Sequence, residues 1–459
     1  MRVLPLLPGS VLIGMIGLLL GGSPAASANA ATGSDEDRLG SVIFIHPDGA
    51  SAATWTAARA LYYGPDGELH WDKMPEVAVY KGHMKDSLTA TSNGGATTHA
   101  YGIKVMSDAY GRTAGGGAGE DIVDANGDSR SVAMQAIRAG LPVGLVQSGI
   151  APEPGTGCFV SRAVSRRDYQ GIAADLIESG AEVLLSGGER YFLPAGASGV
   201  HGPGVRKDGR DLIAEAEAAG YTVVRTRSEL LSLPPGTTRV LGLFAAGSTF
   251  NDITEEALAE RGLEPFDAED TTLAEMTEAA LRVLSSGGQR FLLVVEEEGT
   301  DNFGNKNNAR GVLEAAKRAD DALGVARSFV GAHPGTLLMT AADGDGGGLR
   351  MRGIPVGVGK AGPNRLPAKD VNGAPMDGAN GTATAPFLAA PNANGLRLPF
   401  GVVWASRDDV SGGVVVRGEG LHSERIRGTL DNTDIAKLIR LTLFGLDELD
   451  ERASTSAAP

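Results

Sequence analysis

Cysteine is almost absent from the chain, since Cys158 is the only one among 459 residues. One cysteine excludes an internal disulfide, and a lone thiol is more often a small core residue than a catalyst. Positive charge is also scarce: 41 Lys and Arg residues stand against 56 Asp and Glu residues, which gives a net charge of −15. A nucleic-acid partner requires a basic face that neutralises phosphates, so this balance argues against one. A small phosphorylated ligand requires only local positive charge and remains compatible with the composition.

The apolar stretch near the N-terminus is too short to cross a membrane comfortably. It covers residues 11–20, is broken by glycines, follows Arg2 and precedes the small residues 25–30. This order predicts a signal peptide over residues 1–30, with a retained anchor as the alternative. We therefore expect a mature protein without a membrane span that is secreted or periplasmic. At the other end, residues 451–459 are predicted to form a disordered tail.

Short apolar runs separated by helical patterns indicate the fold class. The clearest runs are Val42–Ile45, Leu292–Val295 and Leu337–Met339, in a chain that is 42% hydrophobic. This alternation favours one α/β unit with a parallel sheet over residues 31–450. Residues from about 346 to 400 are rich in Gly, Pro, Ala and Asn without a clear period. They predict a loop-rich insertion rather than a second domain.

A serine beside two glycines marks a candidate site. Ser92 precedes Asn93, Gly94, Gly95 and a run of small residues, which is typical of a loop that enters the first turn of a helix. The free N–H groups at such a helix start favour an anion, and the glycines let the backbone approach a ligand. Ser92 is therefore a candidate nucleophile, provided that its pKa is lowered. The alternative is that Ser92 only caps the helix.

Acidic residues follow three separate apolar strands: Asp48 the first, Glu296 and Asp301 the second, and Asp343 the third. Parallel strands bring their carboxyl ends to one edge of a sheet, so we expect these side chains to meet. Carboxylates that meet repel one another and require cations. A metal beside Ser92 would lower the pKa of its hydroxyl. The alternative is that each acid is a solvated loop residue.

In order and spacing, these motifs resemble the alkaline phosphatases, a family of metal-dependent phosphomonoesterases, over about residues 39–446. The segments that carry the resemblance are Phe44–Gly49, Ser92–Lys104, Phe159–Arg166, Val295 and Glu296 with Asp301, Thr340–Asp343 and Gly428–Asp434. The resemblance implies a large, mostly parallel central sheet with helices on both faces. It also implies two to three divalent cations and small phosphorylated substrates, and it is compatible with a homodimer.

The resemblance assigns roles residue by residue. Ser92 corresponds to the nucleophile that becomes phosphorylated, and its neighbour Asn93 is a candidate substrate-binding residue. Arg166 corresponds to the arginine that binds the phosphate, a task that suits a bidentate guanidinium. Arg162 and Arg167 are its nearby rivals.

The metal ligands that the resemblance implies are Asp48, Ser92, Thr156, Glu296, Asp301 and Asp343. Asp48 corresponds to an aspartate that bridges two metals, and Asp301 and Asp343 correspond to ligands of the two catalytic metals. Glu296 corresponds to a ligand of the magnesium site. Thr156 matches the hydroxyl ligand of that site only with a shift of one residue.

Three histidines that the family uses in its zinc sites are missing. Asn305 stands where the first is expected, Gly344 followed by Asp345 where the second is expected, and Asp408 or Asp409 where the third is expected. We take Asn305, Asp345 and Asp409 as the replacing ligands. Oxygen donors in place of imidazoles shift the expected preference from zinc, the family norm, to magnesium, calcium or manganese.

The chain has seven histidines, and few of them can replace the missing ligands. His46 and His83 can lie near the cleft, and either would rebuild a zinc ligand if it reached the metals. His99, on the helix after Ser92, is expected to be a packed residue. Thr91 stands before the candidate nucleophile, where the family has an aspartate.

The leading prediction is a secreted, metal-dependent phosphatase that hydrolyses phosphate monoesters through a phosphoserine at Ser92. Phosphodiesterase or related esterase chemistry on the same scaffold is one alternative. A non-catalytic phosphate-binding protein is another, and the joint presence of Ser92, Arg166, Asp48 and Glu296 argues against it.

Overall fold

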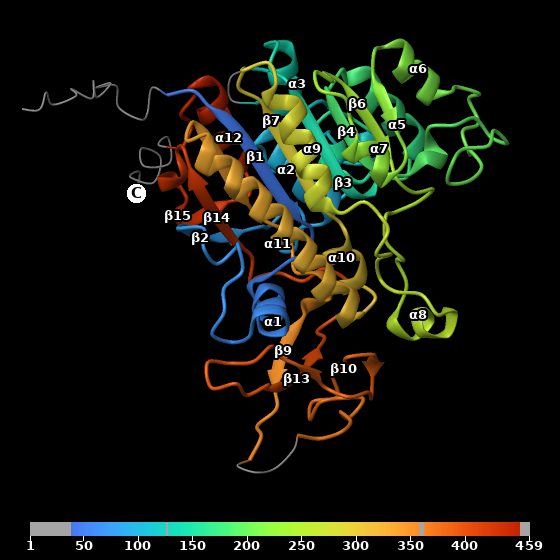
Figure 1. Cartoon of the computed structure of the whole chain (residues 1–459). Helices are drawn as coiled ribbons and strands as arrows, with labels where there is room; N and C mark the ends of the chain where they lie inside the picture. The colour runs from blue at the N-terminus through green and yellow to red at the C-terminus, as the bar shows by residue number, and fades with distance from the viewer. Residues whose placement is uncertain (1–37, 125–126, 358–361, 450–459) are drawn as a thin grey trace, which may run out of the picture.

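A ten-stranded sheet forms the centre of the molecule, in the order β15-β2-β14-β8-β1-β7-β3-β4-β6-β5 (Figure 1). The computed structural model describes residues 38–124, 127–357 and 362–449, so the predicted signal peptide and tail lie outside the described residues. The strands of the sheet are β1 Ser41–Pro47, β2 Glu76–Lys81, β3 Val143–Ile150, β4 Val183–Gly187, β5 Thr222–Val224, β6 Val240–Leu243, β7 Leu292–Glu297, β8 Thr336–Thr340, β14 Val415–Gly420 and β15 Arg427–Asp431. Among these strands only β14 runs antiparallel to its neighbours, β2 and β8. The predicted mostly parallel sheet is therefore confirmed.

The middle strands β8, β1 and β7 form the core of the sheet. Residues Val42–Ile45 and Leu292–Val295 have no exposed surface, and Leu337–Met339 are equally buried. A parallel strand covered by helices on both faces reads as a continuous apolar run, and this is why these three strands are visible in the sequence.

Helices cover both faces of the sheet. The α-helices of the described residues are α1 Ala52–Tyr63, α2 Ser92–Tyr101, α3 Val132–Arg138, α4 Pro154–Gly157, α5 Tyr169–Ser179, α6 Leu212–Ala218, α7 Arg227–Leu231, α8 Glu255–Arg261, α9 Leu273–Ser285, α10 Gly299–Gly304, α11 Ala309–Ala332 and α12 Asp434–Phe444, of which α1 and α8 lie away from the sheet in Figure 1. Helices α9 and α11 pack on each other and cross the face that Figure 1 presents, while α2, α3 and α12 contact one another behind the sheet. The side chain of Asn308 accepts a hydrogen bond from the N–H of Gly311 and so fixes the start of the long helix α11.

Residues between β8 and β14 form an insertion with a small sheet of its own. Its strands are β9 Arg350–Gly353, β10 Met376–Gly378, β11 Gly381–Thr382, β12 Phe387–Leu388 and β13 Pro399–Val403. The sequence predicts a strand close to β13, at Gly401–Ala405, but it does not reveal β9 to β12, because strands of two to four residues are too short to display a period. The insertion leaves and rejoins the main body at the paired residues Asp345 and Val410.

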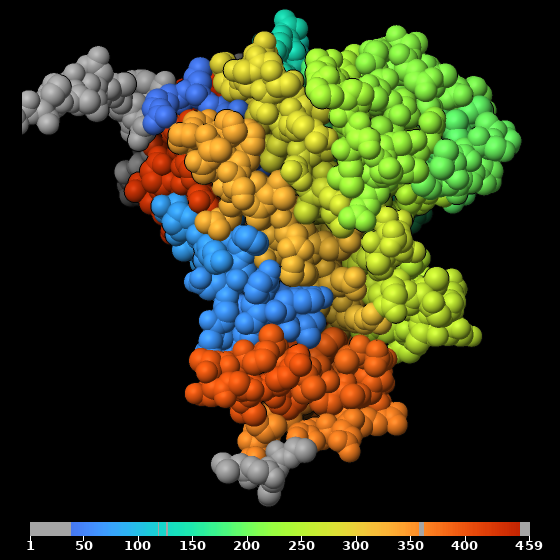
Figure 2. All heavy atoms as spheres, in the orientation of Figure 1, coloured from blue at the N-terminus to red at the C-terminus, as the bar shows by residue number. Residues whose placement is uncertain are grey.

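A second apolar cluster joins the insertion to the main body. Phe400 and Trp404 of the insertion share this cluster with Ala57 of α1, Phe303 of α10 and Leu313 of α11. In Figure 2 the insertion, coloured orange to red, lies directly against the blue segment that contains α1. Among the described residues, no helix is both long and apolar enough to cross a membrane.

Candidate active site

The carboxyl ends of β8, β1 and β7 lie side by side at one edge of the sheet. Strand β1 pairs with both neighbours, with Ile45 opposite Thr340 of β8 and His46 opposite Glu296 of β7. The acids that follow these strands therefore meet, as the sequence predicts. At the turn after β1, Gly49 has a φ of +66°, and a Cβ there would lie 2.9 Å from Oδ1 of Asp301. Only a glycine lets the turn approach this carboxylate so closely.

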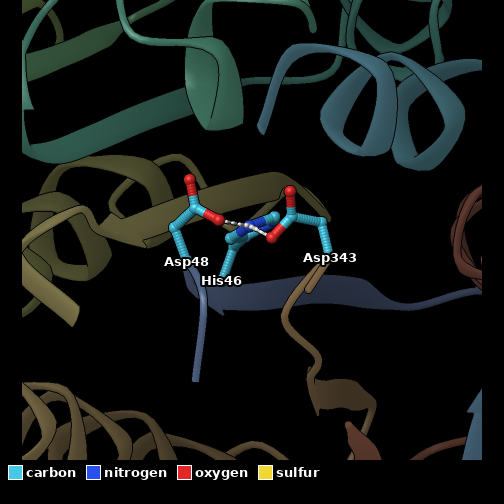
Figure 3. A group of neighbouring side chains, drawn as sticks. All are labelled: His46, Asp48 and Asp343. Atoms are coloured by element: carbon cyan, nitrogen blue, oxygen red, sulfur yellow. Dashed lines mark ion pairs between the residues drawn. The ribbon is translucent and has the colours of Figure 1, made fainter. Parts of the chain in front are cut away.

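One group of possible metal ligands consists of His46, Asp48 and Asp343, all fully buried (Figure 3). Nε2 of His46 lies 3.5 Å from Oδ1 of Asp48 and 3.8 Å from Oδ1 of Asp343. Burial disfavours the charged imidazole, but Asp343 and Asp48 raise the pKa of His46 to about 10. Burial and the charge of Asp343 raise the pKa of Asp48, whereas the nearby Asp48 and His46 side chains outweigh burial and lower the pKa of Asp343. His46 and Asp48 hold protons tightly because the group concentrates negative charge, and a cation satisfies the same requirement.

A second group consists of Asp48, Glu298 and Asp301, and one ligand atom of each lies within 4.8 Å of the others. Asp48 belongs to both groups, which suits a bridging ligand. Within the described residues, both carboxylate oxygens of Asp48 and Oε2 of Glu298 are buried without a hydrogen-bond partner. Burial and the charge of Asp409 raise the pKa of Asp301. Buried oxygens without partners are costly, so these donors fit a divalent cation.

Asp409 approaches this second group through Asn305. The amide nitrogen of Asn305 donates to Oδ1 of Asp301 at 2.8 Å and to Oδ1 of Asp409 at 3.1 Å. Its oxygen accepts from the N–H of Gly347 at 3.0 Å. Of the two rival aspartates, Asp408 is exposed and Asp409 is the one at the site. Asn305 therefore presents its nitrogen to the carboxylates, and its role as an oxygen ligand stays a prediction.

Asp345 is buried but belongs to neither group. Its Oδ2 forms an ion pair with the guanidinium of Arg350 at 2.6 Å. A carboxylate paired with arginine already has its charge compensated, so this geometry gives Asp345 a role at the base of the insertion. Its assignment as a metal ligand stays a prediction.

Glu296 points toward helix α4. Its Oε2 accepts a hydrogen bond from Gln147, and a Cβ on Gly155 would lie 1.9 Å from its Oε1. Burial raises the pKa of Glu296 to about 7. Thr156 is buried beside Gly155 and also lines a small internal cavity with Gln147. The structure therefore places Gly155 directly against the carboxylate at which a magnesium ligand was predicted, and the role of Thr156 as a ligand stays a prediction.

Ser92 is the first residue of α2 and is 5% exposed. Gly95, one turn later, touches Asp343 so closely that a Cβ would lie 2.4 Å from the aspartate Cβ. Residues three apart share a helix face, so Ser92 lies on the side of α2 that meets the first ligand group. The preceding Thr91 caps the helix by accepting from the N–H of Gly94, and the amide of Asn93 donates to two backbone carbonyls of the next loop. The capping role thus falls to Thr91, and substrate binding by Asn93 stays a prediction.

Arg166 is the arginine that faces the acids. Its Nη2 lies 3.1 Å from Oε2 of Glu153. Burial disfavours its charge, but Glu153, Glu298 and Asp48 outweigh burial and raise the pKa of the guanidinium. Of the two rivals, Arg162 pairs with Asp121.

Four further side chains, which the family resemblance does not name as ligands, are now placed relative to the site: Glu298, His46, His83 and His99. Sequence reasoning did not select Glu298 and left His46 as one of two alternatives, yet both belong to the ligand groups. A spacing of two, the period of side chains on one face of a strand, connects His46 with Asp48 and Glu296 with Glu298, although Asp48 and Glu298 lie one residue past the ends of β1 and β7. His83 contacts the carbonyl of Met84 instead, and the fully buried His99 is packed, as expected.

Comparisons with known proteins agree with this arrangement. The family profile described as "Alkaline phosphatase" matches residues 40–444. An alkaline phosphatase of Gadus morhua is 27% identical over 345 residues, covering 67% of this chain and 69% of the relative. A membrane-bound alkaline phosphatase of Bombyx mori is 28% identical over 339 residues, covering 65% of this chain and 59% of the relative.

Solved structures show the same fold. The alkaline phosphatase from Thermus thermophilus matches with a TM-score of 0.68 and 22% identity, covering 92% of this chain and 96% of that one. The enzyme from the Antarctic bacterium TAB5 matches with a TM-score of 0.66 and 20% identity, covering 89% of this chain and 100% of that one. A variant of the Antarctic enzyme has magnesium bound in its M3 site.

Proposed function

The chain belongs to the alkaline phosphatase family of phosphatase enzymes, and from this premise we propose that it hydrolyses small phosphate monoesters through a phosphoserine at Ser92. One observation carries the proposal. The helix that begins at Ser92 packs through Gly95 against Asp343, so the serine borders a group of buried acids that requires cations. The guanidinium of Arg166 lies near Glu153, Glu298 and Asp48 and supplies a positive charge that can bind a phosphate.

The proposed cofactors are two to three divalent cations. Asp48, Asp343 and His46 would hold one, and Asp48, Glu298 and Asp301 would hold another, with Asp409 and Asn305 beside it. Glu296, near Gly155 and Thr156, would contribute to a third. Bound there, such cations stabilise developing negative charge and lower the pKa of a nearby hydroxyl. The groups at Glu298 and at Glu296 offer oxygen donors alone, which favour magnesium or calcium.

In the proposed reaction, Ser92 is the nucleophile and Arg166 orients the phosphate. Ser92 Oγ attacks phosphorus in line, the bond from phosphorus to the alcohol oxygen breaks, and the alcohol leaves with a proton. A water molecule then attacks the phosphoserine, which releases phosphate and restores the Ser92 hydroxyl. Arg166 binds two equatorial phosphate oxygens and keeps the group oriented through both steps. The closed packing of α2 against Asp343 fixes the serine relative to the acids.

We also propose that the protein acts outside the cytoplasm, as a secreted or periplasmic enzyme. The support is the pattern of residues 1–30. We propose small phosphorylated molecules as its substrates. That two copies of the chain form a homodimer is also a proposal.

A hydrolysis assay tests the function. Protein stripped by a chelator and then reloaded with divalent cations is given a chromogenic phosphate monoester, the matching diester and the matching sulfate ester. Metal-dependent release from the monoester in preference to the others is the expected result. Faster release from the diester or the sulfate ester would move the assignment to an esterase of another class. Phosphate binding without turnover would identify a binding protein.

A further inference from the structure

His46 is one of two side chains of its ligand group, with Asp48, whose buried polar atoms all lack a hydrogen-bond partner among the described residues. Its ring is fully buried, and among the described residues neither ring nitrogen has a hydrogen-bond partner. A neutral imidazole ordinarily donates from one nitrogen and accepts at the other, so a buried ring that does neither is unfavourable. The position of the ring therefore points to a partner of another kind.

The spacing around Nε2 indicates what that partner is. The distances of 3.5 Å to Asp48 and 3.8 Å to Asp343 are too long for good hydrogen bonds. Donors that share one tetrahedral metal at about 2.0–2.2 Å lie about 3.4 Å apart, so Nε2 of His46 already stands near the separation from each carboxylate that a metal imposes. Figure 3 shows both carboxylates beside the ring, one from the end of β1 and one from the segment after β8.

Neighbouring rings hold His46 in this orientation. Phe44 and His99 both meet it edge to face, with ring centroids 5.9 Å and 5.2 Å away. His99 is itself fixed, because its Nε2 lies 2.7 Å from the hydroxyl of Tyr80. A side chain that packing locks in one orientation is preorganised for a ligand.

The two ligand groups that share Asp48 differ in chemistry. The group with Glu298 and Asp301 offers oxygen donors alone, whereas the group with Asp343 adds an imidazole. The residue after Asp343 is Gly344, which has no donor side chain, so the nitrogen reaches this group from the neighbouring strand. Carboxylates alone favour magnesium or calcium, and imidazole favours transition metals.

We propose that Nε2 of His46 is a metal ligand and that His46, Asp48 and Asp343 bind a transition-metal dication. Magnesium or calcium would then occupy the all-oxygen group. The inference rests on the proposed metal-dependent function, and it assigns this chain one nitrogen ligand from β1.

Cobalt binding without substrate tests the assignment. Chelator-stripped wild type, His46→Gln and His83→Gln are titrated with Co²⁺, which is followed by its visible absorption and by bound metal per chain. Removing even an outer partner of a ligand weakens metal binding by about 10–100-fold, so His46→Gln should weaken cobalt binding by at least about 100-fold. Its visible spectrum should change as well. His83→Gln, altered at a histidine outside the ligand groups, should match wild type, and magnesium binding should survive in both variants.

Unchanged cobalt affinity and spectrum in His46→Gln would overturn the proposal. If that variant does not fold, wild-type crystals soaked with zinc decide the question by anomalous scattering. A zinc ion at about 2.0–2.1 Å from Nε2 of His46 supports the proposal, and zinc bound without His46 rejects it.

Monoester hydrolysis measured on the same samples separates the two proposals. Cobalt binding through His46 without hydrolysis would sink the proposed function and leave the ligand assignment standing. Monoester hydrolysis together with a cobalt affinity that His46→Gln does not change would support the proposed function and reject the ligand assignment.

Discussion

The guanidinium of Arg166 and the carboxylate of Glu153 form an ion pair, with 3.1 Å between Nη2 and Oε2. The arginine side chain remains 38% exposed, so part of it is open to a ligand while the glutamate restrains the rest. A phosphate that binds here shares Arg166 with a carboxylate already in place. The pair thus sets the orientation of the arginine and moderates its affinity for anions.

Arg166→Ala should weaken phosphate binding more than Arg167→Ala does. The loss of a charge-assisted bidentate contact costs about 1.5–3 kcal/mol, which is about a 10- to 150-fold rise in the inhibition constant of inorganic phosphate. Product inhibition measured on both variants checks this. Inhibition that is unchanged in Arg166→Ala and lost in Arg167→Ala would move the phosphate clamp to the second arginine.

Ser92→Ala should abolish turnover and leave the fold intact. The hydroxyl is the proposed attacking group, and the cap of α2 is supplied by Thr91 instead. Acid quenching with a radiolabelled monoester measures the covalent intermediate, and thermal unfolding of the variant checks the fold. A phosphoenzyme trapped in Ser92→Ala would instead point to the hydroxyl of Thr91.

Metal removal should inactivate the enzyme, and zinc alone should restore it less well than manganese alone. Zinc suits the oxygen-only group poorly, whereas manganese accepts carboxylates readily and tolerates one imidazole. Reconstitution at equal free metal concentrations measures this order. Complete recovery with zinc alone would contradict it and would require further nitrogen ligands at the site.

Gly155→Ala should lower activity and metal content. Its new Cβ would lie 1.9 Å from Oε1 of Glu296, so the carboxylate would have to move. Displacing a site group by about 1 Å costs on the order of 100-fold in rate. Turnover and bound magnesium per chain are the measurements.

Gly331→Ala is the matched control. It adds the same methyl group on α11 where nothing lies within 4 Å, and it should stabilise the fold by about 0.4–1 kcal/mol. Normal activity and metal content in Gly155→Ala would show that Glu296 can move without consequence.

The sequence predicts the acidic edge of the sheet because its central strands are buried on both faces. Val42–Ile45 and Leu292–Val295 read as uninterrupted apolar runs, so their ends, and the acids behind them, are easy to locate. Parallel pairing then brings Asp48 and Asp343 together without any knowledge of the loops between them.

His46 and Glu298 are harder to select from the sequence. His46 lies inside a buried strand, where a histidine reads as a packed residue until its neighbours are known. Glu298 follows two other glutamates, and only the backbone decides which of the three face the site. Glu297 points away and accepts from Ser148, whereas Glu298 joins Asp48 and Asp301. Strands β9 to β12 of the insertion are missed for another reason, because strands of two to four residues show no period.

The insertion joins the main body through a narrow neck. Asp345 and Val410 exchange backbone hydrogen bonds of 3.2 Å and 3.1 Å, and the neck lies between Asp343 and Asp409, two of the proposed ligands. Because the neck is closed by the backbone, the length of chain beyond it can change at little cost, about 0.6 kcal/mol for each doubling of a flexible loop. Phe400 and Trp404 also pack against the main body, so the part of the insertion that can be exchanged is its outer loops. Replacing those loops can change which molecules bind at the surface of the insertion, while the neck preserves the spacing of Asp343 and Asp409.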